Sequence, residues 1–125
     1  MAGAGLRVSV VIPTYNRWDQ LVQVLDGYRQ QTLPLTTFEV LVCDDASTDH
    51  TPSHVQHYAA TAPYALRLLP ARSNAGPAAA RNRGLHAAQA PIVVCTDDDC
   101  VPHPHLLARH AATVSPTTAA IGQIA

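Results

Sequence analysis

Three consecutive aspartates, Asp97, Asp98 and Asp99, directly follow the apolar segment PIVVCT. Carboxylates so close together repel, and each discourages its neighbours from ionising unless water or a cation stabilises the charge. Alternate residues of an extended or turning chain can direct two carboxylates at one point, as Asp97 and Asp99 would. Hard divalent cations prefer oxygen ligands, and Mg²⁺ commonly combines few protein carboxylates with substrate phosphates. The triplet therefore predicts a site for Mg²⁺ or Mn²⁺ that stabilises a diphosphate.

A second acidic pair, Asp44 and Asp45, ends the apolar segment FEVLVCDD. A carboxylate there can accept hydrogen bonds from a sugar hydroxyl or from a base N–H. The alternative for both acidic segments is a structural one, in which the acids are solvated or bond the backbone of a turn. Three acids in a row facing a second acidic segment favour a function, whereas the pair on its own leaves both interpretations open.

The elements that must position these acids follow from the hydrophobic pattern. Apolar, β-branched segments predict four strands, at 6–13, 38–45, 64–70 and 91–96. Helical spacing predicts four helices between and after them, at 17–32, 47–60, 77–90 and 102–114. Thr51 is expected to cap the second helix, and Pro77 suits the first turn of the third. Residues 117–125 are expected to begin a further strand.

Strands that alternate with helices predict an α/β fold with a Rossmann-like, mostly parallel sheet flanked by helices. In such sheets, ligands bind outside the carboxyl ends of the strands, where the strand order reverses. The polar segments PTYNR, DDASTD and TDDDC follow the first, second and fourth predicted strands. They are therefore expected to meet at one edge of the sheet, where the separate acids form one cleft.

Length and composition limit the function. The chain of 125 residues fits one small domain, and 47% apolar with 14% charged residues is typical of a globular protein. A net charge of −1 excludes a nucleic-acid binder that works by neutralising phosphates. All eight basic residues are arginines, so lysine chemistry is excluded. Neither an apolar leader nor a run of the ~18 apolar residues of a spanning helix is present, which predicts a cytoplasmic protein, with peripheral membrane association left open.

The cysteines raise the question of zinc. Cys43 and Cys95 lie inside apolar segments, where a reduced thiol behaves as a small hydrophobic group. Cys100 is followed by His103 and His105, and these ligand types together suit zinc. One cysteine and an H-x-H segment lack the paired spacing of a structural zinc site. The sequence therefore favours the hard cation, with Cys100 taking no part.

The segment NAGPAAARNRG lacks the lysine and the glycine spacing of a Walker loop. Its Arg81 and Arg83 are two residues apart on a predicted helix and so do not share a face. Arg81 is expected to turn into the cleft toward the acids or a phosphate, which guanidinium binds well, and Arg83 to face solvent. Near the end of the first strand, Tyr15 is available to stack on a base, whereas Trp18 is expected to pack on the sheet.

Five segments together resemble the inverting family 2 glycosyltransferases of the GT-A fold: VSVVIPTYNR, QQT, VLVCDDASTDHT, NAGPAAARNRG and TDDDCVPHPHLL. They keep the family's order and spacing from about residue 8 to 107. The resemblance implies an enzyme of the hexosyltransferase type that transfers a sugar from a UDP-type donor to an acceptor hydroxyl, with inversion. It also implies that Mn²⁺ or Mg²⁺ is the cofactor, while the donor sugar and the saccharide or lipid acceptor stay open.

The resemblance further implies which residues bind the donor. The loop around the nucleotide after the first strand would contain Pro13, Thr14, Tyr15 and Arg17. The base would bind Asp45, with Asp44 as a second candidate. The segment that closes over the nucleoside and diphosphate would contain Asn74, Gly76 and Arg81. Either Asp97 or Asp98 would contact the ribose, and the metal would bind Asp99, with Asp97 as a second candidate.

One departure from the family concerns the second half of the domain, which carries the general base and most acceptor-binding residues. The chain ends at Ala125, soon after the three acids. We therefore expect residues 1–125 to form a single, truncated GT-A half-domain that is inactive alone, and no residue is assigned as the base. An unfinished sheet would expose an edge strand, so a homodimer through that edge is plausible.

Two other functions stay open on the residues alone. A nucleotidyltransferase uses a similar sheet and an acidic metal site, but it would be expected to have a phosphate loop rich in Gly, Arg or Lys after the first strand. The segment PTYNR contains neither Gly nor Lys, which counts against this alternative. A non-catalytic nucleotide-binding or interaction module is the second alternative.

Overall fold

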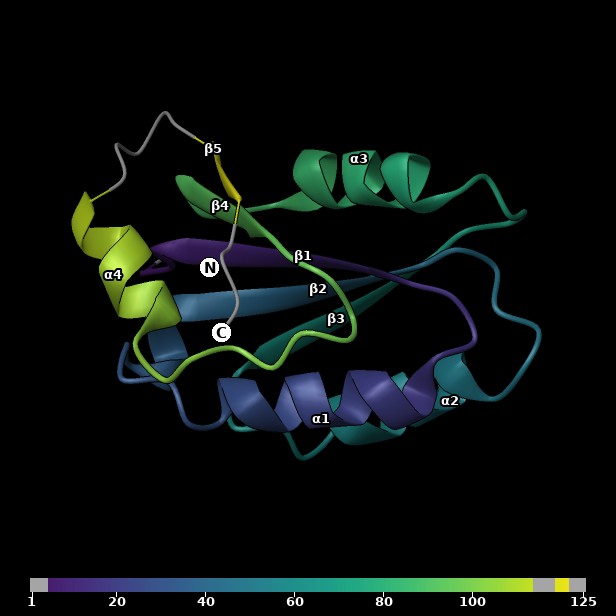
Figure 1. Ribbon diagram of the computed structural model, residues 1–125, viewed down its shortest axis with the longest axis horizontal. Helices are drawn as coiled ribbons and strands as arrows, with labels where there is room; N and C mark the ends of the chain where they lie inside the picture. Colours follow the sequence, from purple (N-terminus) through teal and green to yellow (C-terminus); the bar gives the residue numbers. More distant parts are fainter. Residues whose placement is uncertain (1–4, 114–118, 122–125) are drawn as a thin grey trace.

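The computed structural model describes residues 5–113 and 119–121, which form a five-stranded sheet with helices on both faces (Figure 1). The strands are β1 (Val8–Thr14), β2 (Phe38–Asp44), β3 (Ala65–Pro70), β4 (Ile92–Cys95) and β5 (Ala119–Ile121). Their order across the sheet is β3-β2-β1-β4-β5, and every pairing among the described strands is parallel. The predicted Rossmann-like α/β fold is confirmed.

The helices are α1 (Trp18–Tyr28), α2 (Thr51–Ala59), α3 (Pro77–Ala87) and α4 (Leu106–Thr113), with a short 3₁₀ helix at Leu35–Thr37. Helices α1 and α2 cover one face of the sheet, and α3 covers the other (Figure 1). The period of two in β1 divides its side chains between these faces. Val10 and Ile12 belong to the larger core cluster beneath α1, and Val11 belongs to the smaller cluster beneath α3.

The strand order places a switch point between β1 and β4. From β1 the chain adds β2 and then β3 on one side, whereas β4 and β5 lie on the other. At such a point the connections leave in opposite directions and open a crevice outside the carboxyl ends of the strands. The segments that follow β1 and β4 therefore meet at a place where this fold binds ligands.

At the amino ends of the strands, the buried carboxylate of Glu39 joins several elements of the fold. Glu39, which is 1% exposed, accepts hydrogen bonds from Ser9 Oγ at 2.6 Å and from the Gln89 backbone N–H at 2.8 Å. It also pairs with Arg67 at 3.1 Å, and Arg67 donates a second bond to the Ala87 carbonyl. These contacts tie the end of α3 and the entry to β4 onto three neighbouring strands.

Two helix starts differ from the sequence prediction. Thr51 is the first residue of α2, and its backbone N–H is accepted by Asp49 Oδ1 at 2.9 Å, so the prediction that Thr51 caps the helix is wrong. Helix α4 begins at Leu106 instead of Pro102, because Pro104 disfavours a helical conformation at the residue before it. The strand predicted from residue 117 is present at Ala119–Ile121, and residues 122–125 lie outside the described part.

Strand β3 forms one edge of the described sheet; its end residues Ala65 and Pro70 are exposed, and the residues between them are half-buried. An edge strand leaves backbone groups available to a second chain. Nothing in the described residues shows such a partner, so the homodimer through an edge stays a prediction.

Helix α3 lies unusually close to the sheet at Gly84. A Cβ built on Gly84 would overlap Val11 Cγ1 and lie 2.7 Å from Cys43 Sγ. Gly84 is buried, and both neighbours are core side chains of β1 and β2. Only the absence of a side chain lets the helix reach this position.

Replacing Gly84 by Ala tests this contact. Alanine favours an isolated helix over glycine by ~1 kcal/mol, so a helix without a close neighbour would be stabilised. We expect Gly84→Ala instead to lower the free energy of unfolding by about 1–3 kcal/mol, because the added methyl overpacks the core. Urea denaturation measures the change. Asn82→Ala, at an exposed position of α3, is the matched control and should be neutral or slightly stabilising.

Candidate functional site

An open pocket of about 450 Å³ lies at the carboxyl edge of the sheet. Its lining residues come from the end of β1, from the segments after β1, β2 and β4, and from the start of α3: Pro13, Thr14, Tyr15, Arg17, Asp45, Pro77, Asp97, Asp98 and Asp99. The volume falls within the range of small-molecule sites. The structure thus brings together, in one pocket, acids that lie more than fifty residues apart in the sequence.

Asp98 is the most buried of the three consecutive acids, at 8% exposed. Thr14 Oγ1 donates a hydrogen bond to its Oδ2 at 2.8 Å, and Arg17 Nε lies 3.3 Å from its Oδ1. Burial raises the pKa of Asp98, and the contacts with Thr14 and Arg17 oppose that shift. The carboxylate is therefore fixed by a hydrogen bond from Thr14, the last residue of β1, and by an ion pair with Arg17 from the loop that follows.

Arg17 also reaches the next acid. Its Nη2 lies 3.3 Å from Asp99 Oδ2, so one guanidinium bridges two neighbouring carboxylates. The arginine side chain is 44% exposed and that of Asp99 is 50% exposed. The sequence places Arg17 in the loop after the first strand but does not reveal this bridge.

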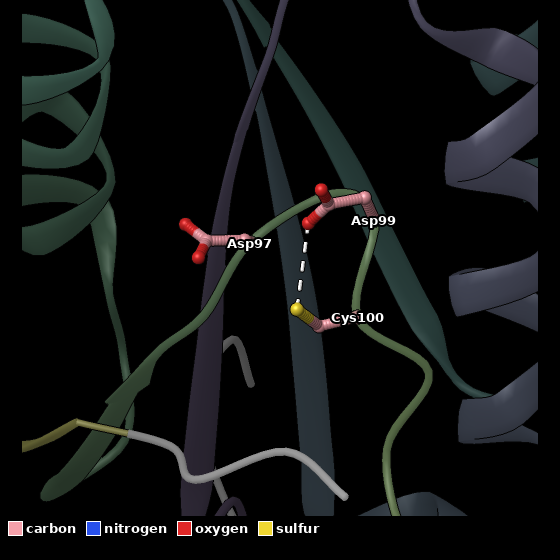
Figure 2. Close-up of side chains that lie close together, drawn as sticks. All are labelled: Asp97, Asp99 and Cys100. Atoms are coloured by element: carbon pink, nitrogen blue, oxygen red, sulfur yellow. Dashed lines mark hydrogen bonds between the residues drawn. The ribbon is translucent and has the colours of Figure 1, made fainter.

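Asp97, Asp99 and Cys100 form a group whose ligand atoms all lie within 4.8 Å of one another. Figure 2 shows the Cys100 thiol donating to Asp99 Oδ1, at 3.4 Å. Desolvation and the neighbouring Asp99 raise the pKa of Cys100, which favours the protonated thiol. The two carboxylates fit a hard divalent cation, and the sulfur adds a softer donor. Cys100, expected to take no part, lies in this group because the chain turns at Asp98 and Asp99.

Asp45 is buried against the segment that precedes α3. Its two carboxylate oxygens accept the backbone N–H groups of Ala75 at 2.9 Å and Gly76 at 2.8 Å, and its carbonyl accepts from Asn74 Nδ2. Gly76 has φ of 94° and ψ of 166°, a conformation that is essentially restricted to glycine. Asn74 and Gly76 therefore fasten this segment to Asp45 and do not themselves line the pocket.

Asp44 has a different environment from Asp45. It is 1% exposed, and its carboxylate accepts both the backbone N–H and the hydroxyl of Ser47. This is the backbone-bonded turn that a sequence of Asp and Ser favours. Asp44 does not line the pocket, and a role in binding the base stays a prediction.

Asn16 joins the loops that follow β1 and β2. Its backbone N–H donates to Ser47 Oγ at 2.9 Å, and its Oδ1 accepts the N–H of Thr48 at 2.8 Å. Both Asn16 and Ala46 have positive φ, of 52° and 62°. Asparagine tolerates this conformation, whereas for alanine it costs about 1–2 kcal/mol. Sequence reasoning missed Asn16, because its partners Ser47 and Thr48 lie more than thirty residues away in the chain.

The two arginines of α3 are placed differently from the prediction. Arg83 was expected to face solvent, but it is half-buried and donates to the carbonyls of Leu69 at 2.9 Å and Asp44 at 3.0 Å. That prediction is wrong, because α3 packs so close to the sheet that Arg83 reaches the ends of β2 and β3. Arg81 does not line the pocket. It lies near the buried Cys95, where burial raises the thiol pKa and Arg81 opposes the shift.

The two aromatic residues after β1 lie in different surroundings. Tyr15 is 40% exposed and lines the pocket. Trp18 packs against the larger core cluster and stacks on His54 of α2, with ring centroids 5.0 Å apart.

This chain belongs to glycosyl transferase family 2, whose profile matches residues 9–125. It is 36% identical over 110 residues to the glycosyltransferase AglE of Haloferax volcanii, covering 88% of this chain. Two solved structures resemble it in fold. Staphylococcus aureus TarS in complex with UDP-GlcNAc has a TM-score of 0.79 and 33% identity over 86% of the chain. The mannosyltransferase PcManGT of Pyrobaculum calidifontis, in complex with GDP-Man and Mn²⁺, has a TM-score of 0.80 and 40% identity over 90% of the chain.

The chain spans only part of each of these relatives. It covers 36% of AglE, 30% of the TarS structure and 33% of PcManGT. Within residues 5–113 and 119–121, no helix has the length and apolar character needed to cross a bilayer.

The bonds of Asp45 to residues 75 and 76 are open to a direct test. We expect Asp45→Ala to lower the free energy of unfolding by about 1–3 kcal/mol, because two backbone N–H groups lose their acceptor. Asp97→Ala, at an exposed carboxylate of the same pocket, should change it by no more than about 0.5 kcal/mol. Chemical denaturation of the two variants measures both values, and equal losses would contradict the structural role of Asp45.

Proposed function

We propose that this chain binds the donor of a metal-dependent, inverting glycosyltransferase that uses a nucleotide sugar of UDP type. The observation that carries the proposal is the pocket at the switch point of the sheet, which combines an exposed aromatic ring with four carboxylates and one arginine. Membership of glycosyl transferase family 2 supports the proposal. So do the UDP-GlcNAc complex of TarS and the GDP-Man complex of PcManGT.

The base is proposed to bind between Tyr15 and Asp45. The Tyr15 ring is exposed in the pocket and offers a face for stacking. A carboxylate has about four acceptor positions, and Asp45 uses two of them for Ala75 and Gly76. The remaining positions can accept an N–H from the edge of a base. Asp44 remains the second candidate for this role.

The diphosphate is proposed to bind near Asp97, Asp99 and the start of α3. Pro77 lines the pocket, so the first turn of α3, the positive end of the helix dipole, lies at its wall. Asn74, Gly76 and Arg81 belong to the segment that would close over the diphosphate. Asp99 and Asp97 would hold Mn²⁺ or Mg²⁺, which neutralises the charge that develops on the departing diphosphate. Asp98, held by Thr14, would contact the ribose.

In the proposed reaction, an acceptor hydroxyl attacks the anomeric carbon of the donor sugar. The bond from that carbon to the diphosphate oxygen breaks, the configuration inverts, and the hydroxyl proton passes to a general base. Because the chain spans 36% or less of AglE, TarS and PcManGT, we propose that the base and the acceptor site are supplied by residues beyond these 125. Residues 1–125 would then bind the donor without transferring its sugar.

Calorimetry with UDP, in the presence and absence of Mn²⁺, tests donor binding. We expect UDP to bind much more tightly with Mn²⁺, because the metal offsets repulsion between the diphosphate and the carboxylates. Asp99→Ala should weaken the Mn²⁺-dependent binding by at least about tenfold. Asp26→Asn, which removes one charge at the far end of α1, is the control and should bind normally. The site assignment fails if UDP does not bind or if Asp99→Ala binds as the wild type does.

The proposed role of Asp45 predicts a preference among bases. Uracil presents an N–H at N3, whereas cytosine presents a lone pair at the same atom. Facing a carboxylate, that lone pair would leave a buried acceptor without a donor. With Mn²⁺ present, UDP should therefore bind about tenfold or more tightly than CDP. Competition between the two nucleotides measures the ratio, and equal affinities would remove Asp45 from the base site.

A further inference from the structure

Arg17 is the only basic residue among those that line the described pocket, and four carboxylates line it with Arg17. A nucleoside diphosphate would enter this pocket with negative charge of its own. Without a cation, the diphosphate would face Asp45, Asp97, Asp98 and Asp99 with one guanidinium to offset them. The position of Arg17 therefore affects how a cation and a diphosphate bind in this pocket.

In the structure, Arg17 already forms ion pairs with Asp98 and Asp99, the acids proposed to bind the ribose and the metal. Its Nε lies 3.3 Å from Asp98 Oδ1, and its Nη2 lies 3.3 Å from Asp99 Oδ2. The other oxygen of Asp99 accepts the Cys100 thiol at 3.4 Å. Each oxygen of Asp99 thus already has one contact, and a cation that binds this carboxylate competes with the positive charge of Arg17.

The two carboxylates that Arg17 bridges differ in how firmly they are held. The Asp98 side chain is 11% exposed and is also bonded by Thr14 Oγ1 at 2.8 Å. The Asp99 side chain is 50% exposed, and so is much of Arg17, at 44%. Ion pairs with this exposure are weak, and a divalent cation outcompetes a single guanidinium charge for a carboxylate. The contact with Asp99 is therefore the one that gives way, with Asp98 as the pivot.

We propose that Arg17 is an internal counter-ion that a divalent cation displaces from Asp99, and that the freed guanidinium then binds the diphosphate. This inference rests on the proposed function. Metal alone must break the Arg17–Asp99 pair with no new partner for the arginine. Metal together with a nucleoside diphosphate supplies that partner, so the two ligands bind more tightly together than separately. Such coupling is reciprocal, because each ligand raises the affinity for the other by the same factor.

The first test measures Mn²⁺ binding with and without UDP, using the electron paramagnetic resonance of free Mn²⁺. We expect Arg17→Gln to bind Mn²⁺ alone about two- to tenfold more tightly than the wild type, because the competing ion pairs are gone. UDP should bind this variant more weakly, and the factor by which UDP raises Mn²⁺ affinity should fall. The control is Arg7→Gln, which removes the same charge just before β1, at the opposite end of that strand. It should behave as the wild type does.

A second measurement separates displacement from a simple change of charge. The side-chain Nη2–H signal of Arg17, from the group that is paired with Asp99, can be assigned in ¹⁵N-labelled chain by its loss in Arg17→Gln. We expect Mg²⁺ with UDP to move this signal away from its metal-free position. Mg²⁺ alone should move it toward its position in metal-free Asp99→Asn, in which the anionic partner is absent. A signal that keeps its metal-free position when the site is saturated with Mg²⁺ overturns the proposal.

The outcomes also distinguish this inference from the proposed function. If the wild type binds Mn²⁺ and UDP together but Arg17→Gln binds Mn²⁺ alone no more tightly, only the role of Arg17 is wrong. If neither chain binds UDP with Mn²⁺, the proposed donor site fails and the inference fails with it. Tighter Mn²⁺ binding by Arg7→Gln as well would reduce the effect to net charge and overturn the specific role.

Discussion

The candidate site depends on holding four carboxylates in one pocket without letting their repulsion disperse them. The parallel sheet brings them there, because the carboxyl ends of β1, β2 and β4 lie at one edge. Separate partners then hold them in place. Asp45 is bonded by backbone N–H groups, Asp98 by Thr14 and Arg17, and Asp99 by Arg17 and Cys100. Asp97 is exposed to solvent. Each carboxylate is therefore stabilised by its own partners in the protein or by solvent, and these partners hold the four acids in one pocket.

The packing of α3 on the sheet fixes the position of Pro77, the residue of this helix that lines the pocket. Gly84 lets the helix approach β1 and β2, and Arg83 bonds the carbonyls where β2 and β3 end. At its other end, α3 follows Gly76, whose N–H binds Asp45. A helix held at both its middle and its start cannot shift without moving Asp45. Packing on one face of the sheet is thereby linked to a polar residue at its edge.

Much of this arrangement was predictable from the sequence, for a definite reason. The polar segments PTYNR, DDASTD and TDDDC each follow an apolar strand. A parallel sheet has only one carboxyl edge at which they can meet. The misplaced residues depend on tertiary distances that no local pattern contains. Arg83 reaches two strand ends only because Gly84 brings α3 close, and Cys100 joins the acids only because the chain turns at Asp98 and Asp99. Thr51 failed as a cap because Asp49, two residues earlier, supplies the acceptor.

The charges of the pocket affect how the proposed donor would enter it. A diphosphate brought alone to four carboxylates is repelled, and a cation brought alone must compete with Arg17. Each ligand removes the obstacle to the other, since the cation neutralises the acids and the diphosphate accepts the guanidinium. Asp98, buried and bonded by Thr14, can stay in place through this exchange while Arg17 turns around it. If Arg17 has the proposed role, a pocket built this way would favour the complex of metal and nucleotide over either component, through side chains that are already in contact in the structure.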